Sequence, residues 1–589
     1  MWSGLRHGHA ATIMKNFTYL ARISTISFFL ALLLSAAGRS SFSEALRASY
    51  QEPYPPAENI DYEMYQRIRA EGLGHSRVME YASALMDGIG PRLTGSPNLR
   101  RAYVWSLDQL KAMGCLNAHV EDWGEFGMGW QELNTWVRMT SPDTAVLIAR
   151  PVPWSPSSHG PVSGPAVWVQ VKKEEDLEQY KGKLADKVVL FGDMRAVGPV
   201  DEPLFYRKTE NDLARVKEYP LTPESEDNDV QAFKRSQKRR EAILKFFAAE
   251  RALAVIVPSR DGDHSGGSGG TIFVDLRNLP WWSYRREHAL PIPIVVMAIE
   301  NYGRIYRLIK ANVPVKIELN VDTRFTGDHE HGMNTIAEIP GTDPKLKDEV
   351  VMLGAHLDSW ASGTGATDNG AGVAIALEVM RILNVLNVKP RRTIRIALWA
   401  GEEQGYGSAG YVKEHFGYVP LSNEPDQADL PNFLRKPAGE IVLKPEQQKI
   451  SGYFNLDNGT GKILGVYLQE NAAMAPIFSQ WMEPLKDLGV TTLTQRDIGD
   501  TDHVSFDTVN IPGFQFIQDT MDYMSRSHHS NMDTFERLQA ADLAQAATVE
   551  AVFVFNAAMR DQMLPRKPMP NPPLDEERKT SPENLMPRD

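Results

Sequence analysis

The sequence contains a single cysteine, Cys115, among its 589 residues. No disulfide can therefore form within one chain, so the fold must be stabilised by its hydrophobic core and by any bound metal. Cys115 stands at the end of an expected helix, where a thiol commonly packs as a small apolar side chain. We expect it to be buried.

An excess of positive charge is also absent: the net charge is −12 and the isoelectric point is near 5.7. Proteins that bind nucleic acid need a basic surface, and we therefore exclude nucleic acid as a partner. The remaining composition, 42% hydrophobic and 23% charged, is typical of a globular protein. The length allows about three or four domain-sized units.

Long hydrophobic runs are missing except near the N-terminus, where Ile23 to Gly38 is uncharged and follows Lys15 and Arg22. A basic start, a short apolar core and small residues predict a secretory signal peptide over residues 1–37, cleaved after Ala37. The run falls short of the ~20 residues that span a bilayer, and a signal anchor is the alternative. We expect an exported protein, periplasmic or extracellular, without a membrane span after cleavage.

The rest of the chain divides into regions that differ in composition and hydrophobic pattern. Residues 38–59 read as a proline-containing linker and residues 60–144 as the helical start of a folded domain. Short β-rich runs over residues 145–325 predict a separate β-rich module. Over residues 326–562, apolar strands alternate with helices, which predicts an α/β sheet covered on both faces. Residues 563–589 are rich in proline, and we expect them to be a disordered tail.

Metal-capable side chains follow the strands of the last region. In α/β sheets, functional groups collect at the C-terminal ends of strands, so we expect these side chains to meet. Taken singly, each could be a turn, a helix cap or a solvated strand end. Gathered together, their carboxylates would repel one another unless cations compensated them. The side chains are His356, Asp358, Asp368, Glu402, Glu403, Asp457, Asp519, His528, His529 and Asp533.

A pair of divalent cations would resolve this repulsion. The two cations would carry a charge of +4. Three carboxylates, Asp368, Glu403 and Asp457, and one bridging hydroxide would bring the site to neutrality, and the imidazoles of His356 and His529 would complete the ligand set. Mixed imidazole and carboxylate ligands suit zinc. Two ions ~3.5–4 Å apart can hold a nucleophilic water and a substrate oxygen. We therefore hypothesise two Zn²⁺, exchangeable with other divalent metals.

Two further acidic groups have expected roles around these ligands. Asp358, two residues after His356, is placed to accept the second ring N–H of that histidine. A hydrolytic site also needs an unliganded general base, which either Glu402 or Glu403 could supply. Spacing alone does not decide between them. The glycines around Asp368 allow a tight turn that returns it towards His356.

The motifs together resemble the di-zinc exopeptidases of the aminopeptidase and carboxypeptidase Q family, over residues 60 to 560. The matching pieces are "GAHLDSW", "GATDNGAG", "LWAGEEQGYGSAGY", "NLDNGTG", "GDTDHVSFDTVNIPG" and "HHSNMDT". The resemblance implies a zinc-exopeptidase-like α/β fold, with a mixed sheet sandwiched by helices. It also implies that residues 145–325 are an inserted β-rich protease-associated domain.

The resemblance further implies a role for each site residue. One zinc would be bound by His356 and Asp457, the other by Glu403 and His529, with Asp368 bridging the two, Glu402 as general base and Asp358 supporting His356. His529 is chosen over His528 because it stands four residues before Asp533. A cis peptide between Asp368 and Asn369 is implied as well.

Two stretches depart from this pattern or compete with it. "NLDNGTG" stands where carboxypeptidase Q has Glu-Ser-Asp, although the expected ligand Asp457 is retained. "GDHEHG", residues 327–332, could be mistaken for a metal site, but it falls in the expected connector before the catalytic domain. We do not count it as a site.

These inferences predict a secreted hydrolase, a zinc aminopeptidase or dipeptidase acting on short peptides or dipeptides. A metal-bound hydroxide would attack the carbonyl, and Glu402 would pass the proton to the leaving amine. Two alternatives stay open: a single-zinc transferase similar to glutaminyl cyclase, and a catalytically inactive receptor-like homologue. Retention of His356 and Asp457 argues against the first, and the intact set of six positions against the second. The number of subunits is not predicted, and a homodimer is one arrangement that the sequence allows.

Overall fold

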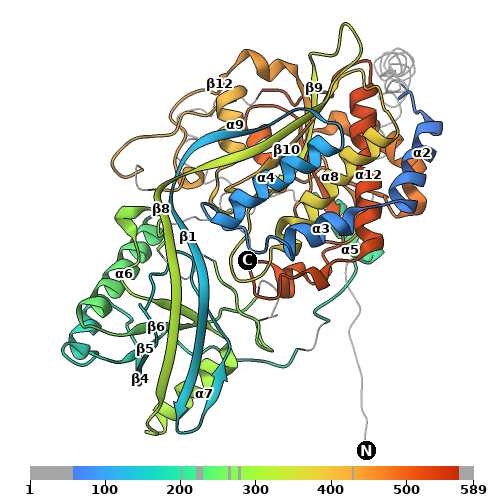
Figure 1. Ribbon diagram of the computed structural model, residues 1–589. Coiled ribbons are helices and arrows are strands. Elements are labelled where there is room, and N and C mark those ends of the chain that lie inside the picture. Colours follow the sequence, from blue (N-terminus) through green and yellow to red (C-terminus); the bar gives the residue numbers. More distant parts are fainter. Residues whose placement is uncertain are drawn as a thin grey trace, which may run out of the picture. The chain divides into compact units, whose positions relative to one another are not determined.

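The computed structural model describes residues 57–200, 203–219, 230–262, 267–275, 280–427 and 430–569. The expected signal peptide, nearly all of the linker and residues 570–589 of the expected tail lie outside the described residues. Within the described part, no helix is both long and apolar enough to cross a membrane. Figure 1 shows the arrangement of the described elements.

Three helices open the folded region: α2 (Tyr62–Gly74), α3 (Val78–Met86) and α4 (Pro97–Ala112). α4 begins where Ser96 accepts a hydrogen bond from the Leu99 N–H, with Pro97 in its first turn, which is the usual chemistry of a helix start. Cys115 follows the end of α4 and is buried, as expected.

The main sheet runs in the order β15-β14-β16-β13-β9-β10-β8. Its four central strands β16, β13, β9 and β10 are mutually parallel, whereas β8 pairs antiparallel with β10, and β14 pairs antiparallel with β16. The sheet is therefore mixed. Its strands are β8 (Lys316–Ile339), β9 (Val350–His356), β10 (Thr393–Trp399), β13 (Ile450–Asn455), β14 (Ile463–Tyr467), β15 (Thr492–Thr494) and β16 (Gly513–Gln518).

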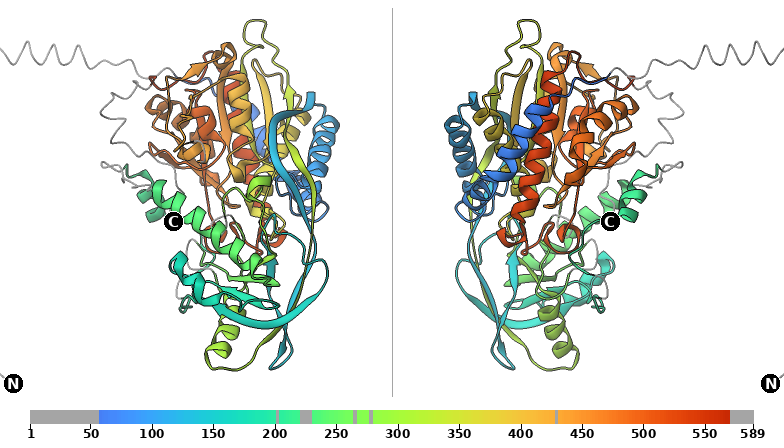
Figure 2. Two further views of the ribbon diagram at one scale, coloured as in Figure 1. Left: turned by 90° about the vertical axis from the view of Figure 1, so that its left-hand side faces the viewer. Right: turned by 90° about the vertical axis from the view of Figure 1, so that its right-hand side faces the viewer.

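Helices cover both faces of this sheet (Figure 2). Alternate residues of β9 belong to different cores: Val351 and Leu353 pack with the first set of helices, and Val350 and Met352 with the second. This explains why the strand sequence is apolar throughout. The first set is α2, α3, α4, α8 (Ala371–Val385), α10 (Ala475–Met482) and α12 (Ala540–Met559); the second is α9 (Ser408–His415) and α11 (His503–Asp507). The expected α/β class, with a mixed sheet between helices, is confirmed.

A long two-stranded ribbon leaves the main sheet. β1 (Leu116–Ser141) is one continuous strand, and it pairs antiparallel with β8 along nearly its whole length. The pairing continues past Gly124, Gly127 and Gly129 because the register shifts at those positions. In Figure 1 the two strands run side by side into the β-rich segment.

The stretch "GDHEHG" lies within β8, not in a connector as expected. A ring nitrogen of His329 lies 2.6 Å from the Glu125 carboxylate, and one of His331 lies 2.8 Å from the Asp122 carboxylate. Both pairs join β8 to β1 on the exposed side of the ribbon. The histidines of this motif therefore have cross-strand partners of their own.

The β-rich segment extends the same sheet beyond β8 in the order β4-β5-β6-β7-β3. It has two hydrophobic cores of its own. The expected boundary at residue 325 falls inside the continuous strand β8, and the assignment to a protease-associated domain stays a prediction. Its elements are β2 (Ala145–Leu147), β3 (Ala149–Pro151), β4 (Val162–Val169), β5 (Val188–Phe191), α5 (Glu210–Lys217), α6 (Val230–Ala249), β6 (Ala254–Pro258), β7 (Ile294–Met297) and α7 (Ile299–Lys310).

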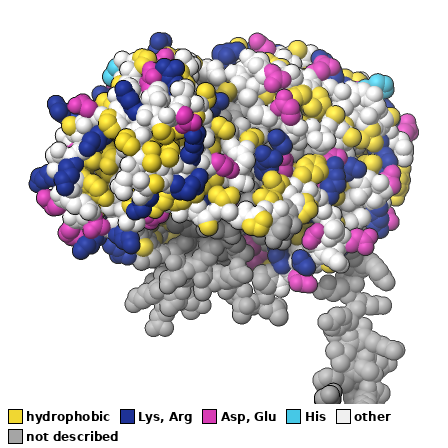
Figure 3. All heavy atoms as spheres, turned by 90° about the horizontal axis from the view of Figure 1, so that it is seen from below, with side chains coloured by type: hydrophobic (Ala, Val, Ile, Leu, Met, Phe, Trp, Pro, Cys, Tyr) yellow, Lys and Arg dark blue, Asp and Glu magenta, His cyan; other side chains and the backbone are white. Residues whose placement is uncertain are grey.

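Oppositely charged side chains pair on the surface of this segment, as Arg138 does with Glu318 and Arg304 with Asp143, each at 2.8 Å. Figure 3 shows Lys, Arg, Asp and Glu side chains interspersed over the face seen from below. Exposed ion pairs contribute only ~0–1 kcal/mol each. The cores, rather than these pairs, stabilise the segment.

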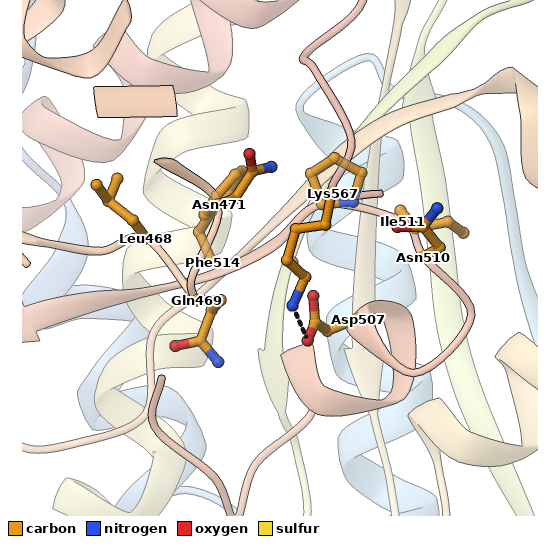
Figure 4. A pocket seen from close by; sticks show the side chains of 10 residues that line it. Leu468, Gln469, Asn471, Asp507, Asn510, Ile511, Phe514 and Lys567 are labelled. Carbon is orange, nitrogen blue, oxygen red and sulfur yellow. Dashed lines mark hydrogen bonds and ion pairs between the residues drawn. The ribbon is translucent and has the colours of Figure 1, made fainter. Parts of the chain in front are cut away.

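The chain after α12 stays packed against the sheet through residue 569, so the expectation of a disordered tail is wrong for residues 563–569. Leu564 is buried, and the Arg566 guanidinium donates hydrogen bonds to three backbone carbonyl groups. Lys567 Nζ lies 2.7 Å from the Asp507 carboxylate of α11 (Figure 4). The buried side chain of Leu564 and the hydrogen-bonded side chains of Arg566 and Lys567 hold this segment in place despite its prolines.

Candidate metal centre and active site

The five expected ligands meet at one edge of the main sheet. His356 is the last residue of β9, Asp457 follows the end of β13, and His529 lies in the loop that follows β16. Glu403 lies on a short 3₁₀ turn, Glu402–Gln404, directly after β10. Because the central strands are parallel, their C-terminal ends share this edge, and residues far apart in sequence converge there.

Asp368 lies at the middle of the cluster. Its Oδ1 is 3.2 Å from Nε2 of His356, and its Oδ2 is 3.2 Å from Nε2 of His529. His356 Nε2 is also 3.4 Å from Asp457 Oδ1, and His529 Nε2 is 3.1 Å from Glu403 Oε2. The cluster thus has two halves that share Asp368: the His356 half, with Asp457, and the His529 half, with Glu403.

The turn that carries Asp368 is tied to the strand end that carries Asp457. The peptide bond between Asp368 and Asn369 is cis, as the resemblance implies. The Asn369 side chain donates to the Leu456 carbonyl and accepts a hydrogen bond from the Gly372 N–H. These two bonds hold Asp368 in place beside Asp457.

The atoms that face the middle of the cluster lack hydrogen-bond partners in the described part of the chain. They are Nε2 of His356, Oδ2 of Asp368, Oε1 of Glu403 and Oδ1 of Asp457, all buried. Buried polar atoms nearly always have a partner, so converging lone pairs without one point to a cation. Ligand atoms of His356, Asp368 and Glu403 lie within 4.8 Å of one another. Imidazole and carboxylate donors fit zinc.

The charges in the cluster also indicate a bound cation. Burial alone would lower the pKa of His356, but Asp457 and the neighbouring aspartates raise it well above its usual range. Burial raises the pKa of Glu403 to about 7, with Asp368 adding to the effect and His529 opposing it. The raised pKa of His356 reflects the carboxylates around it, and the raised pKa of Glu403 reflects mainly its burial; bound cations would compensate both.

The two adjacent glutamates occupy different places. Glu403 contacts His529, whereas the nearest recorded approach of Glu402 is 4.0 Å, from its Oε2 to His356 Nε2. Burial raises the pKa of Glu402 well above its usual range, although the nearby His356 opposes this, and Asp457 adds to it. The distances favour Glu403 as a ligand and leave Glu402 for proton transfer.

Asp358 supports the site differently from the expectation. The Nδ1–H of His356 donates to the backbone carbonyl of Asp358 at 3.1 Å, while the carboxylate Oδ1 lies farther away, at 3.6 Å. The carboxylate instead accepts hydrogen bonds from the Thr94 hydroxyl and from the backbone N–H groups of Glu402 and Glu403. Asp358 therefore holds the imidazole through its backbone and the glutamate turn through its side chain.

Sequence reasoning missed Arg92, which lies in the turn-rich "GIGPRLTG" stretch. Its buried guanidinium donates hydrogen bonds to the carbonyl groups of Leu357, Thr364 and Gly365. Burial lowers the pKa of Arg92 to about 10, against the opposing charge of Asp533. Arg92 fastens the loop after His356 to the loop before Asp368. An arginine inside a glycine- and proline-rich turn is the one sequence feature that could have indicated this structural role.

Sequence reasoning also missed Asp275, which belongs to the β-rich segment. Its Oδ2 lies 3.4 Å from Nδ1 of His529 and 3.1 Å from Nη2 of Arg260. Asp275 and His529 are 254 residues apart, so no motif spacing relates them.

The remaining candidate residues lie outside the five expected ligands. His528 Nε2 lies 4.0 Å from Asp368 Oδ2, farther than His529. The Asp533 carboxylate accepts a hydrogen bond from the Thr367 N–H and so anchors the Asp368 turn. Asp519 pairs with Arg207 of the β-rich segment, outside the cluster. Asp502 of the "GDTDH" motif is also buried, and burial raises its pKa to about 8.

A cavity of about 70 Å³ lies beside the Glu402–Gln404 turn. The buried Gln404 amide lines it, and neither its oxygen nor its nitrogen has a hydrogen-bond partner in the residues described. Arg285 stacks at 4.1 Å on the ring of Trp282. The cavity's aromatic walls with a few polar groups are like those of ligand sites, and its volume, well below the ~300–1,000 Å³ of most such sites, fits a small group. Its lining is Trp281, Trp282, Tyr284, Arg285, Gln404, Gly405, Tyr406, Pro431 and Asn432.

Parts of the sequence are similar to known peptidases. Residues 334–554 match the model of peptidase family M28. Carboxypeptidase Q of Bos taurus is 25% identical over 501 residues, which cover 84% of this chain and 88% of that protein. Leupeptin-inactivating enzyme 1 of Streptomyces exfoliatus is 31% identical over 191 residues, 32% of this chain and 36% of that protein.

The solved structure of a peptidase M28 precursor from Shewanella amazonensis has the same fold, with a TM-score of 0.57 and 23% identity over 87% of this chain and 99% of that one. The match to the family model covers the part of the chain that supplies all five expected ligands. Over residues 334–554 the chain is similar to peptidase family M28, and it is a metallo-exopeptidase.

Proposed function

We propose that this protein is an exported di-zinc exopeptidase, an aminopeptidase or dipeptidase, that hydrolyses short peptides. One observation carries the proposal: the two oxygens of Asp368 each lie 3.2 Å from a different imidazole. Each imidazole then has a carboxylate of its own. This divides the donors into two sets that share one bridge, as a two-metal hydrolytic site requires.

His356, Asp457 and Asp368 would hold one ion, and His529, Glu403 and Asp368 the other. When bound, zinc polarises the scissile carbonyl and lowers the pKa of a water molecule. The chain supplies the fixed donor geometry: Arg92 and Asn369 fasten the loops that carry the donors.

Glu402 takes the proton from the attacking water and delivers it to the leaving amine. Its raised pKa suits a group that must accept a proton and then release it. Asp358 fixes the turn beneath it, because its carboxylate accepts the backbone N–H groups of Glu402 and Glu403. Proton transfer by a positioned carboxylate contributes about 10²–10⁴-fold to a rate.

The cavity beside this turn supports a peptide substrate. The Gln404 side chain offers one acceptor and an NH₂ donor, which match the N–H and C=O of a peptide group. The aromatic walls would pack against one side chain of the substrate. Trp282 and Arg285 come from the β-rich segment, which supports its role as a protease-associated domain bordering substrate access. Export from the signal over residues 1–37 and a homodimer remain predictions.

The convergence of both halves also bears on the alternative functions. A single-zinc transferase would not need a second imidazole–carboxylate pair on the far side of Asp368. An inactive homologue would not need to keep five donors pointing at one another, because such an arrangement of largely buried charges is costly without cations.

The test has two measurements on purified mature protein: zinc per chain by elemental mass spectrometry, and hydrolysis of a panel of dipeptides and tripeptides. We expect about two zinc ions per chain, with loss of zinc and activity together in chelator. Glu402→Gln should retain both ions and lose about 10²–10⁴-fold in kcat. One zinc per chain under metal-replete conditions would overturn the di-zinc site, and a fully active Glu402→Gln would overturn the general base.

A further inference from the structure

We propose that Asp275, a residue of the β-rich segment, is a positioning residue of the metal centre that holds the His529 imidazole in its ligand orientation. The inference rests on the proposed function, since it concerns the ion of the His529 half. It makes the β-rich segment a structural part of the metal centre as well as a neighbour of the substrate cavity.

The two nitrogens of His529 face different carboxylates. Nε2 lies 3.1 Å from Glu403 and 3.2 Å from Asp368, whereas Nδ1 lies 3.4 Å from Oδ2 of Asp275. A neutral imidazole carries one N–H. If Nδ1–H donates to Asp275, Nε2 keeps its lone pair for a cation, which is the usual role of a carboxylate behind a histidine ligand.

Asp275 is itself held in place. It is 4% exposed, and the largely buried guanidinium of Arg260 lies 3.1 Å from its Oδ2. Arg260 stacks at 4.5 Å over the ring of Phe273 and donates to the Asp261 carbonyl. The carboxylate therefore has a charged partner that is fixed by packing, and it remains aimed at the imidazole.

Backbone pairing sets the register between the two segments. The Val274 N–H donates to the His529 carbonyl at 2.9 Å, and the Asn531 N–H donates to the Ile272 carbonyl at 3.0 Å. Phe273 and Ser530 form an antiparallel bridge between them. The segment that carries Asp275 is thus paired with the segment that carries His529. A shift of the β-rich segment would remove the partner of this imidazole while leaving the His356 half intact.

The Asn531 side chain belongs to the same contact but is independent of the imidazole. Its Oδ1 accepts the Ile272 N–H at 2.7 Å, and its Nδ2 donates to the Gly270 carbonyl at 3.2 Å. Asn531→Ala therefore removes two side-chain hydrogen bonds of this contact but keeps its backbone pairs and both ring-nitrogen contacts of His529. It serves as the matched control for Asp275→Ala.

The experiment is a zinc titration of metal-free mature protein against a competing chelator, with wild type, Asp275→Ala, Asp275→Asn and Asn531→Ala. We expect Asp275→Ala to weaken one of the two zinc sites by about 10–100-fold and to leave the other unchanged, which makes the titration biphasic. Asp275→Asn should fall between wild type and Asp275→Ala, because the amide oxygen still accepts the Nδ1–H. Asn531→Ala should bind both ions as the wild type does.

Thermal unfolding of the metal-free variants separates positioning from folding. Asp275→Ala should unfold near the wild-type temperature while differing in zinc affinity. Equal zinc titrations of wild type and Asp275→Ala, or equal weakening by Asn531→Ala, would overturn the inference. A wild-type protein that binds fewer than two ions would instead overturn the proposed function, so the two failures are distinguishable.

Discussion

The two halves of the metal centre use the same kinds of ligand but obtain their support from different places. In the His356 half, the acceptor of the Nδ1 proton is the carbonyl of Asp358, two residues along the chain. In the His529 half, the nearest acceptor is Asp275, 254 residues away in the β-rich segment. The imidazole of the first half is therefore supported from its own strand end. The second requires a distant segment to dock, so the two halves should respond differently to substitution.

The largest effect is expected where the halves meet. Asp368→Ala removes the carboxylate that both share, so both zinc affinities should fall steeply. Hydrolysis should fall by at least about 10³-fold, because metal and general-base catalysis fail together. Zinc analysis and peptide assays measure this. A variant that keeps either ion at wild-type affinity would contradict the role of Asp368 as a bridge.

Variants of single ligands should separate the halves. His356→Ala and His529→Ala each remove one imidazole, so each protein should retain one ion per chain while hydrolysis falls by about 10²-fold or more. Asp275→Ala added to His529→Ala should change zinc content no further, since its imidazole partner is already gone. A further loss in the double variant would show that Asp275 acts through something other than His529.

Replacing the supporting aspartates, Asp358 and Asp275, should affect the two halves in different ways. Asp358→Asn keeps the backbone carbonyl that accepts the His356 proton, so its zinc content should match the wild type. Its kcat should fall by about tenfold, within the range for supporting groups, because the amide cannot accept the N–H groups of both Glu402 and Glu403 as the carboxylate does. Asp275→Asn should instead alter zinc affinity. The same change in both variants would erase the distinction between the halves.

The last effect concerns folding stability rather than activity, and it comes from a buried carboxyl group outside the metal centre. Glu550 of α12 is fully buried, neither oxygen has a hydrogen-bond partner in the residues that the structure covers, and burial raises its pKa from 4.5 to about 8. A carboxyl group with a raised folded-state pKa stabilises the protein most below the unfolded pKa. This stability is lost as pH rises towards the folded pKa.

Glu550→Gln should remove this dependence. Between pH 6 and 8.5 the wild type should lose about 1–3 kcal/mol more unfolding free energy than the variant. Urea unfolding at several pH values measures the difference, with metal-saturated protein throughout. Parallel pH profiles for the two proteins would show that Glu550 has a partner in solution.

The sequence was sufficient for the parts of the site that follow strand ends. His356, Glu402, Glu403 and Asp457 come directly after apolar strands, and parallel strands deliver their C-terminal ends to one edge. The same alternation of apolar strands and helices predicts the α/β class. Local patterns succeed here because the geometry of a parallel sheet is the same wherever such strands occur.

Features that depend on distant pairing could not be predicted in this way. Nothing near Asp275 or His529 in sequence indicates that their segments pair. The ribbon of β1 and β8 also escaped prediction, because glycines that normally interrupt a strand are accommodated by register shifts in the paired structure. Residues 563–569 likewise owe their order to partners outside the segment, among them Asp507.

The most direct test of the account is a crystal structure of the zinc-loaded protein with anomalous diffraction measured at the zinc absorption edge. The account predicts two peaks ~3.5–4 Å apart on either side of the Asp368 carboxylate, one beside His356 and Asp457 and the other beside His529 and Glu403. A single peak, or a second peak that does not contact His529, would contradict it.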